Sequence, residues 1–121
     1  MELKEVETIR VGGYTFVVSI DNHQMETVQL LGRCVTDDLR IIMRDNAPKA
    51  ILAETLLHEV VHAIFDVYME GIDDKINSEH VVAMISQGFF QVLQDNPEFT
   101  YFVSGGFEDE EEEDEPDTTC S

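Results

Sequence analysis

Residues 48–69 read PKAILAETLLHEVVHAIFDVYM, and their periodicity sets the architecture expected of the chain. Apolar side chains recur along this stretch at helical spacing: Ile51, Leu52, Leu56, Val60, Ile64 and Phe65. That spacing places them on one face of an α-helix. Proline is tolerated in the first turn of a helix, and glycine commonly ends one. Pro48 and Gly71 therefore bound a helix that is predicted over about 48–69.

Two strand pairs are expected before this helix. From Ile9 to Ile20, apolar and polar residues alternate on either side of Gly12-Gly13, which is typical of a hairpin with a two-residue turn. A second hairpin fits residues 28–43, and its parts are a strand near Val28–Val35, a turn at Asp37-Asp38 and a returning strand over Leu39–Met43.

A second helix is expected after the first. It spans about 77–95, with Asn77 or Ser78 as the N-cap and Asn96-Pro97 as the stop. Phe99–Val103 then adds a short strand or packs back on the core. The predicted fold class is α+β, in which N-terminal antiparallel hairpins of about four strands pack on two C-terminal helices.

The charge of the chain is strongly negative and unevenly spread. The 121 residues carry 26 acids and 7 bases, a net charge of −19, and eight consecutive acids occupy 108–115. Because such a block repels itself and offers no apolar face, we expect one domain over 1–107 and a disordered acidic tail over 108–121. Phosphates would be repelled, which argues against nucleic acid or a membrane surface as partners. The tail either keeps the chain soluble or docks a basic host protein.

The sequence also predicts a compartment. It contains no run of 18 apolar residues, and its first residues, MELKEVETIR, lack the apolar stretch of a signal peptide. Cys34 and Cys120 lie far apart and form no C-x-x-C pair. These features predict a cytoplasmic protein with two free thiols.

Residues 58–62, H-E-V-V-H, lie in the middle of the first predicted helix. Positions i and i+4 share one face of a helix, so His58 and His62 can offer two imidazole nitrogens to one metal ion. Glu59 is turned by about 100° from His58 and can reach a water at the metal without binding the metal itself. Imidazoles bind Zn²⁺ well, and a carboxylate can take a proton from water that zinc acidifies. The pattern predicts a zinc site, and the alternative is a pair of core histidines bonded to their neighbours.

A catalytic zinc site needs a third protein ligand. The longer pattern H-E-x-x-H-x-x-G-x-x-H is absent because Phe65 and Tyr68 occupy its glycine and last histidine positions, which excludes a metzincin. Glu79 is the favoured third ligand, since the start of a helix stabilises a carboxylate. His80 beside it is the alternative, and Glu70 at the end of the first helix is a poorer candidate.

At these residues the chain resembles a known family. LLHEVVHAIFDVY, followed by INSEHVVAMISQGFFQVLQDNPEF, is similar to the small zincin-type metallopeptidases of bacteriophages and prophages, distant relatives of the ImmA/IrrE and SprT-like groups. The resemblance covers about 48–99 and implies a gluzincin, in which His58, His62 and Glu79 bind zinc and Glu59 is the general base. The SprT-like pattern would place the third ligand at His80. Zincins also bind substrate by β-augmentation on an edge strand beside the active-site helix.

Two functions remain open on the sequence. The first is a zinc-dependent metallopeptidase, encoded by a phage or another mobile element as the resemblance implies. In this enzyme Glu59 serves as base and then as acid, and the substrate is a protein or peptide in the cytoplasm of a bacterial host. The second is a non-catalytic, zinc-scaffolded acidic protein that engages a host protein as a decoy or inhibitor, which the small size and the net charge of −19 favour. Glu59 favours the enzyme, because a scaffold needs metal ligands but no general base.

Overall fold

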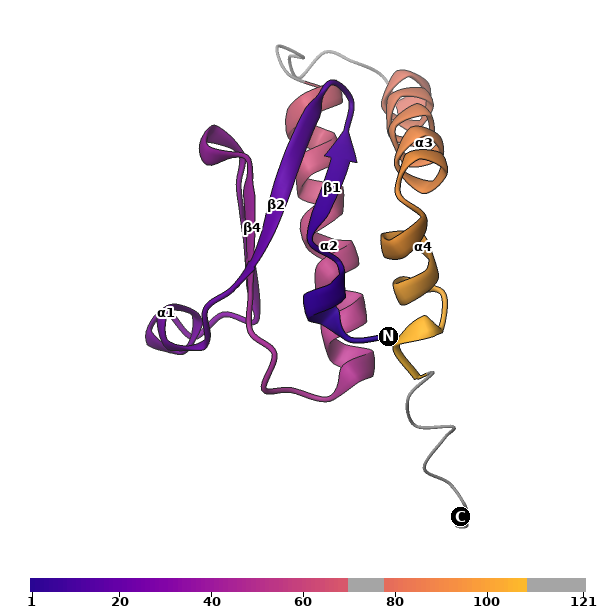
Figure 1. The fold of residues 1–121 in the computed structure, drawn as a ribbon. Helices are drawn as coiled ribbons and strands as arrows, with labels where there is room; N and C mark the ends of the chain where they lie inside the picture. Colours follow the sequence, from indigo (N-terminus) through magenta and orange to yellow (C-terminus); the bar gives the residue numbers. More distant parts are fainter. Residues whose placement is uncertain (70–77, 109–121) are drawn as a thin grey trace.

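The computed structural model describes residues 1–69 and 78–108. Four positions or segments to which the sequence assigns a role lie outside these ranges: Glu70, Gly71, Asn77 and the tail from 109 onward. The fold is α+β, as predicted, with a four-stranded sheet in the N-terminal half and α2 lying along it (Figure 1).

The sheet contains four short strands in the order β1-β2-β4-β3. Their bounds are β1 Thr8–Val11, β2 Tyr14–Ile20, β3 Gly32–Val35 and β4 Arg40–Met43. Both predicted hairpins form, since β1 pairs with β2 and β3 pairs with β4 in antiparallel register. Gly12, at φ +62°, makes the tight turn between Val11 and Tyr14. β3 begins four residues later than the predicted strand at Val28.

The two hairpins join through a parallel pair of strands, so the sheet is mixed, and this pairing was not predicted from the sequence. β2 and β4 pair in parallel, with Val17 opposite Arg40 and Ile20 opposite Met43. Parallel neighbours need a crossover connection, and here α1 (Asn22–Thr27) and β3 supply it. The N-cap of α1 is Asp21, whose Oδ1 accepts a 3.0 Å hydrogen bond from the backbone N–H of Gln24.

α2 (Lys49–Tyr68) is the predicted first helix, with Pro48 as its N-cap rather than in its first turn. Its apolar stripe forms the centre of the core and faces the sheet. The buried side chains of α2 are Leu52, Ala53, Leu56, Glu59, Val60, Ala63 and Ile64. Against them pack buried residues of the strands, among them Ile9, Val11, Phe16, Ile41 and Met43.

The C-terminal helices pack beside β1 and α2 (Figure 1). α3 spans Ser78–Asp95, and α4 spans Pro97–Val103 with Pro97 at its start. The strand expected over Phe99–Val103 is therefore wrong, whereas its packing on the core is correct, because Phe99 and Phe102 are buried. Short 3₁₀ helices complete the fold: η1 Leu3–Glu5, η2 Thr36–Asp38 and η3 Gly106–Glu108.

The outer edge of β1 is closed by side chains from the end of α3. Asn96 accepts a hydrogen bond from the Arg10 N–H at 2.7 Å and donates one to the Arg10 carbonyl at 2.9 Å. Gln91 accepts a hydrogen bond from the Gly12 N–H at 2.8 Å. Asn96 and Gln91 thus stand in for a neighbouring strand, and β3 forms the other edge of the sheet.

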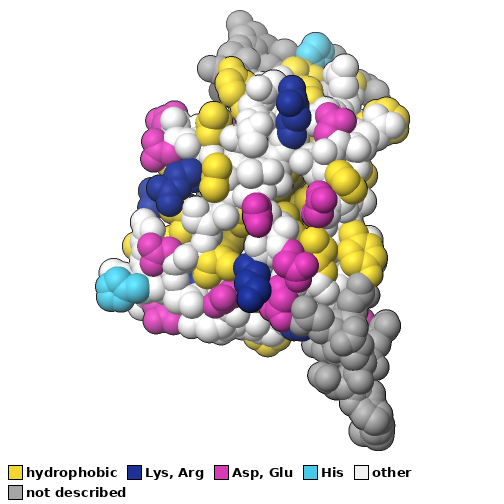
Figure 2. All heavy atoms as spheres, in the orientation of Figure 1, with side chains coloured by type: hydrophobic (Ala, Val, Ile, Leu, Met, Phe, Trp, Pro, Cys, Tyr) yellow, Lys and Arg dark blue, Asp and Glu magenta, His cyan; other side chains and the backbone are white. Residues whose placement is uncertain are grey.

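The surface of the described domain mixes charge types. On the face that Figure 2 shows, acidic and basic side chains are interspersed with hydrophobic ones. Of the helices in the described ranges, none combines the length and the apolarity needed to cross a bilayer.

Candidate metal centre

His58 and His62 stand on one exposed face of α2, in its third and fourth turns. Their ring centroids are 4.9 Å apart, and the ring planes are inclined by 70°. Both side chains are exposed, so the alternative of two histidines buried in the core is wrong. Two neighbouring imidazoles that face solvent from an apolar helix suit a metal ion bound from outside.

Glu59 is turned from the histidines toward β3 and is only 7% exposed. Burial raises the pKa of this carboxyl group, because a low-dielectric surrounding disfavours the charged form. His58, His62 and a backbone hydrogen bond from Cys34 each oppose that rise in pKa. The carboxyl group therefore lies against the backbone of β3, within electrostatic range of both imidazoles.

β3 and η2 run alongside α2 and border the motif. A Cβ atom added to Gly32 would lie 3.0 Å from Thr55 Cγ2 and 3.3 Å from Glu59 Cγ, so the glycine lets the strand approach the helix closely. At the far end, Thr36 Oγ1 donates a hydrogen bond to Asp66 Oδ2. The chain from Gly32 to Thr36 thus follows α2 past both histidines.

The backbone of β3 offers hydrogen-bonding groups to the outside. The Arg44 N–H donates to the Leu31 carbonyl at 3.0 Å, and opposed pairs in an antiparallel ladder alternate between bonded and non-bonded. Gly32 and Cys34, opposite Met43 and Ile41, are therefore in non-bonded pairs and point their N–H and C=O groups away from β4. Glu59 lies against the outward-facing backbone of Cys34.

Two candidates for a third metal ligand, Glu79 and His80, lie in the first turn of α3. α3 begins at Ser78, so Glu79 stands in its first turn, as predicted, but the side chain of Glu79 lies outside the described part of the structure. His80 is exposed. Within residues 1–69 and 78–108, no three side chains of the His, Cys, Asp and Glu types form a group that could hold a metal ion, so the structure does not bring His80 to His58 and His62.

Three residues near the motif were not predicted from the sequence to belong to it: Cys34, Thr36 and Asp66. Burial raises the pKa of the Cys34 thiol, the Thr36 hydrogen bond lowers it, and the charges of Asp66 and Glu59 raise it further. Asp66 could have been found, because it follows His62 by four residues and so continues the same helix face. Cys34 and Thr36 lie near the motif only because of how the strands pair, and no pattern in the neighbouring sequence indicates that pairing.

Two hollows flank the motif along the border between β3 and α2. One, of about 250 Å³, contains His58 and Glu59 and is walled by Leu30, Leu31 and Gly32. The other, of about 300 Å³, lies beyond the end of β3. Its lining residues are Tyr14, Thr36, Asp37, Leu39, Asp66 and Val67.

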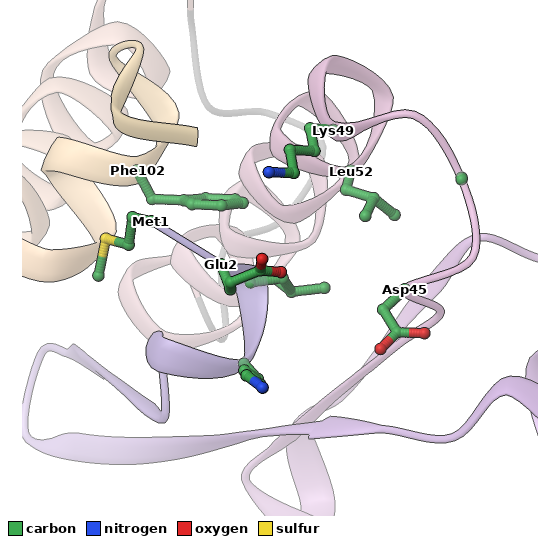
Figure 3. A pocket seen from close by; sticks show the side chains of 9 residues that line it. Met1, Glu2, Asp45, Lys49, Leu52 and Phe102 are labelled. Atoms are coloured by element: carbon green, nitrogen blue, oxygen red, sulfur yellow. The ribbon is translucent and has the colours of Figure 1, made fainter. Parts of the chain in front are cut away.

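A third hollow, of about 140 Å³, lies away from the motif at the first turns of α2 (Figure 3). Met1, Lys49, Leu52 and Phe102 line it together with residues of η1. Lysines and carboxylates share its wall, and no residue of the H-E-V-V-H motif does.

Comparison of the chain with protein-family models, curated proteins and solved structures finds no match in any of the three.

Proposed function

We propose that the chain is a zinc-dependent peptidase in which His58 and His62 hold the metal and Glu59 moves the proton. The observation that carries the proposal is the placement of Glu59. It is 7% exposed, lies beside two exposed imidazoles and contacts the backbone of an edge strand. A non-catalytic zinc scaffold has no use for a buried carboxyl group of raised pKa, whereas a general base does.

The donor set fits zinc. Two imidazoles with centroids 4.9 Å apart on one helix face are common zinc ligands, and we propose Glu79, in the first turn of α3, as the third. When bound, zinc supplies a Lewis acid and lowers the pKa of water. These residues also carry the resemblance to the small phage-encoded zincins, which stays part of the proposal.

The chain's own residues account for the remaining steps. Glu59 accepts a proton from the attacking water and later donates it to the leaving amine, a role suited to a carboxyl group whose pKa burial raises. The outward N–H and C=O groups of Gly32 and the outward C=O group of Cys34 bind the substrate backbone as an added strand, since the Cys34 N–H already donates to Glu59. The scissile peptide then lies across α2, next to His58 and His62.

A cleavage assay on an unfolded protein tests the proposal. With zinc-loaded protein and casein as substrate, we expect Glu59→Gln to lower the rate by about 10²- to 10⁴-fold, the usual contribution of a general base, while zinc content stays unchanged. Glu98→Gln is the control, because Glu98 is an exposed glutamate of α4 that lines neither hollow beside the motif, and it should cleave like the wild type. Equal cleavage by wild type and Glu59→Gln would show that Glu59 does no chemistry.

A further inference from the structure

The hollow of about 300 Å³ beyond β3 combines an apolar wall with two carboxylates. Tyr14, Leu39 and Val67 supply the wall, and Asp37 and Asp66 supply the charge. Asp66 accepts a hydrogen bond from Thr36 Oγ1 through Oδ2, so its other oxygen remains for a ligand. A cavity of this kind suits a side chain with a long aliphatic stem and a cationic head.

The position of this hollow relates it to the motif. Asp66 stands one turn beyond His62 on the same face of α2, and Thr36 follows Cys34 by two residues. In an extended peptide, every second side chain points the same way, and such side chains are about 7 Å apart. A peptide paired with β3 beside Glu59 would therefore place a side chain, about two residues further on, at the hollow where β3 ends at Val35.

We infer that this hollow selects a lysine or arginine side chain of the bound peptide, so that the substrates are polypeptides with a basic residue at a fixed distance from the scissile bond. The inference rests on the proposed function for the path of the peptide. Asp66 and Asp37 bind the cationic head, and charge-assisted hydrogen bonds of this kind are stronger than neutral ones. The methylene stem packs on the wall formed by Tyr14, Leu39 and Val67.

A binding experiment tests this inference apart from catalysis. Two fluorescein-labelled decapeptides of alternating alanine and threonine carry one central residue, arginine in the first and citrulline in the second. Citrulline has nearly the same shape as arginine but no charge. Anisotropy titration of full-length Glu59→Gln protein with zinc should show about fivefold to tenfold tighter binding of the arginine peptide, the effect of one to two partly exposed ion pairs.

The aspartates provide matched controls. Asp37→Asn and Asp66→Asn should each reduce the arginine preference to about twofold or less, whereas Asp38→Asn should keep it. Asp38 is an exposed neighbour of Asp37 in η2 that does not line the hollow. If Asp66→Asn unfolds because its contact with Thr36 weakens, the exposed Asp37 still gives a usable variant.

Three results would overturn the inference: equal binding of the two peptides, binding of neither, or an equal loss of preference in Asp38→Asn and Asp37→Asn. The last result would mean that cations are attracted to the acidic chain as a whole. Cleavage of casein by the wild type, with no preference for arginine over citrulline in binding, would leave the proposed function standing and reject this inference alone.

Discussion

At the scale of single residues, the site depends on Glu59 being both buried and ionisable. Seven residues on the inner side of α2 are buried, and Glu59 is the charged one among them. Its pKa is raised by burial, so the folded chain holds this proton more tightly than the unfolded chain does. The contribution of Glu59 to the free energy of unfolding therefore falls as pH rises from the ordinary glutamate pKa to the raised one.

This sign gives a prediction for the metal-free protein. Glu59→Gln is neutral at every pH and removes the cost of burying a charge. Its Tm in the presence of a chelator should exceed that of the wild type at pH 7, and the difference should shrink at pH 4, where the carboxyl group is largely protonated in both states. Thermal unfolding at the two pH values measures this. A variant that is less stable than the wild type at pH 7 would contradict the assignment of a desolvated carboxyl group.

Gly32 sets how closely β3 approaches Glu59. A Cβ there would meet Met43 Sδ at 2.8 Å and Glu59 Cγ at 3.3 Å, so Gly32→Ala must push the strand or the carboxyl group aside. We expect a loss of about 1–3 kcal/mol in the free energy of unfolding, as for other overpacked sites, and a lower rate of cleavage.

Gly13→Ala is the control for Gly32→Ala, because a Cβ at Gly13 meets no atom within 4 Å. Denaturant unfolding of both variants should place Gly13→Ala within about 0.5 kcal/mol of the wild type. Equal stability of the two variants would show that the space between β3 and α2 accommodates a Cβ atom at position 32, which would contradict the close approach of the strand to the helix.

At the scale of elements, the two sheet edges differ in what covers them. The polar groups of Arg10 in β1 are bonded by Asn96, which also donates a hydrogen bond to the Val92 carbonyl at 2.8 Å. The outward groups of β3 face α2 and the motif instead. A peptide strand added under the proposed function would therefore pair with β3.

Asn96→Ala should be strongly destabilising. The side chain is 6% exposed and serves three backbone groups, those of Arg10 and Val92. Leaving buried polar groups without partners costs about 1–3 kcal/mol each, and we expect a total of about 2–4 kcal/mol, since Gln91 also donates to the Arg10 carbonyl at 3.1 Å. Gln94→Ala, at an exposed site on α3, should change the free energy of unfolding by less than about 0.5 kcal/mol. Denaturant titration of both decides the matter.

The choice of third ligand depends on an element too, because the orientation of the first turn of α3 decides which side chain faces the two histidines. Adjacent residues on a helix point about 100° apart, so only one of Glu79 and His80 can face His58 and His62. We expect Glu79→Ala to weaken zinc binding strongly and His80→Ala to change it by less than about tenfold, the lower limit for residues that only support a ligand. Zinc titration showing the reverse order would make the site a three-histidine one.

At the scale of the whole molecule, the parts that could be predicted are those with a local cause. The period of α2 and the i, i+4 pair of His58 and His62 depend on neighbours within a few residues, and both are present. The segment that forms α4 could also be read as a strand. Phe99, Tyr101 and Val103 alternate with other residues, and the stretch is too short to show a helical period. The parallel pairing of β2 with β4 depends on contacts more than twenty residues apart in sequence.

The residues around the H-E-V-V-H motif are also brought there by contacts between segments that are far apart in sequence. Cys34 and Thr36 reach Glu59 and Asp66 only because β3 is an edge strand that lies along α2. The sequence alone therefore predicts the motif of the proposed metal site but not the hollows beside it, since each hollow is lined by α2 together with segments that precede α2 in the chain.

The proposal that His58 and His62 bind zinc is tested by the zinc content of the purified full-length protein and of its histidine variants. We expect one zinc per chain in the wild type and in His23→Ala, whose histidine is exposed on α1. We expect little or no zinc in His58→Ala and His62→Ala, since loss of a ligand exceeds the 10- to 100-fold effect of a supporting residue. Well under one zinc per wild-type chain, unchanged in His58→Ala, would contradict the proposal.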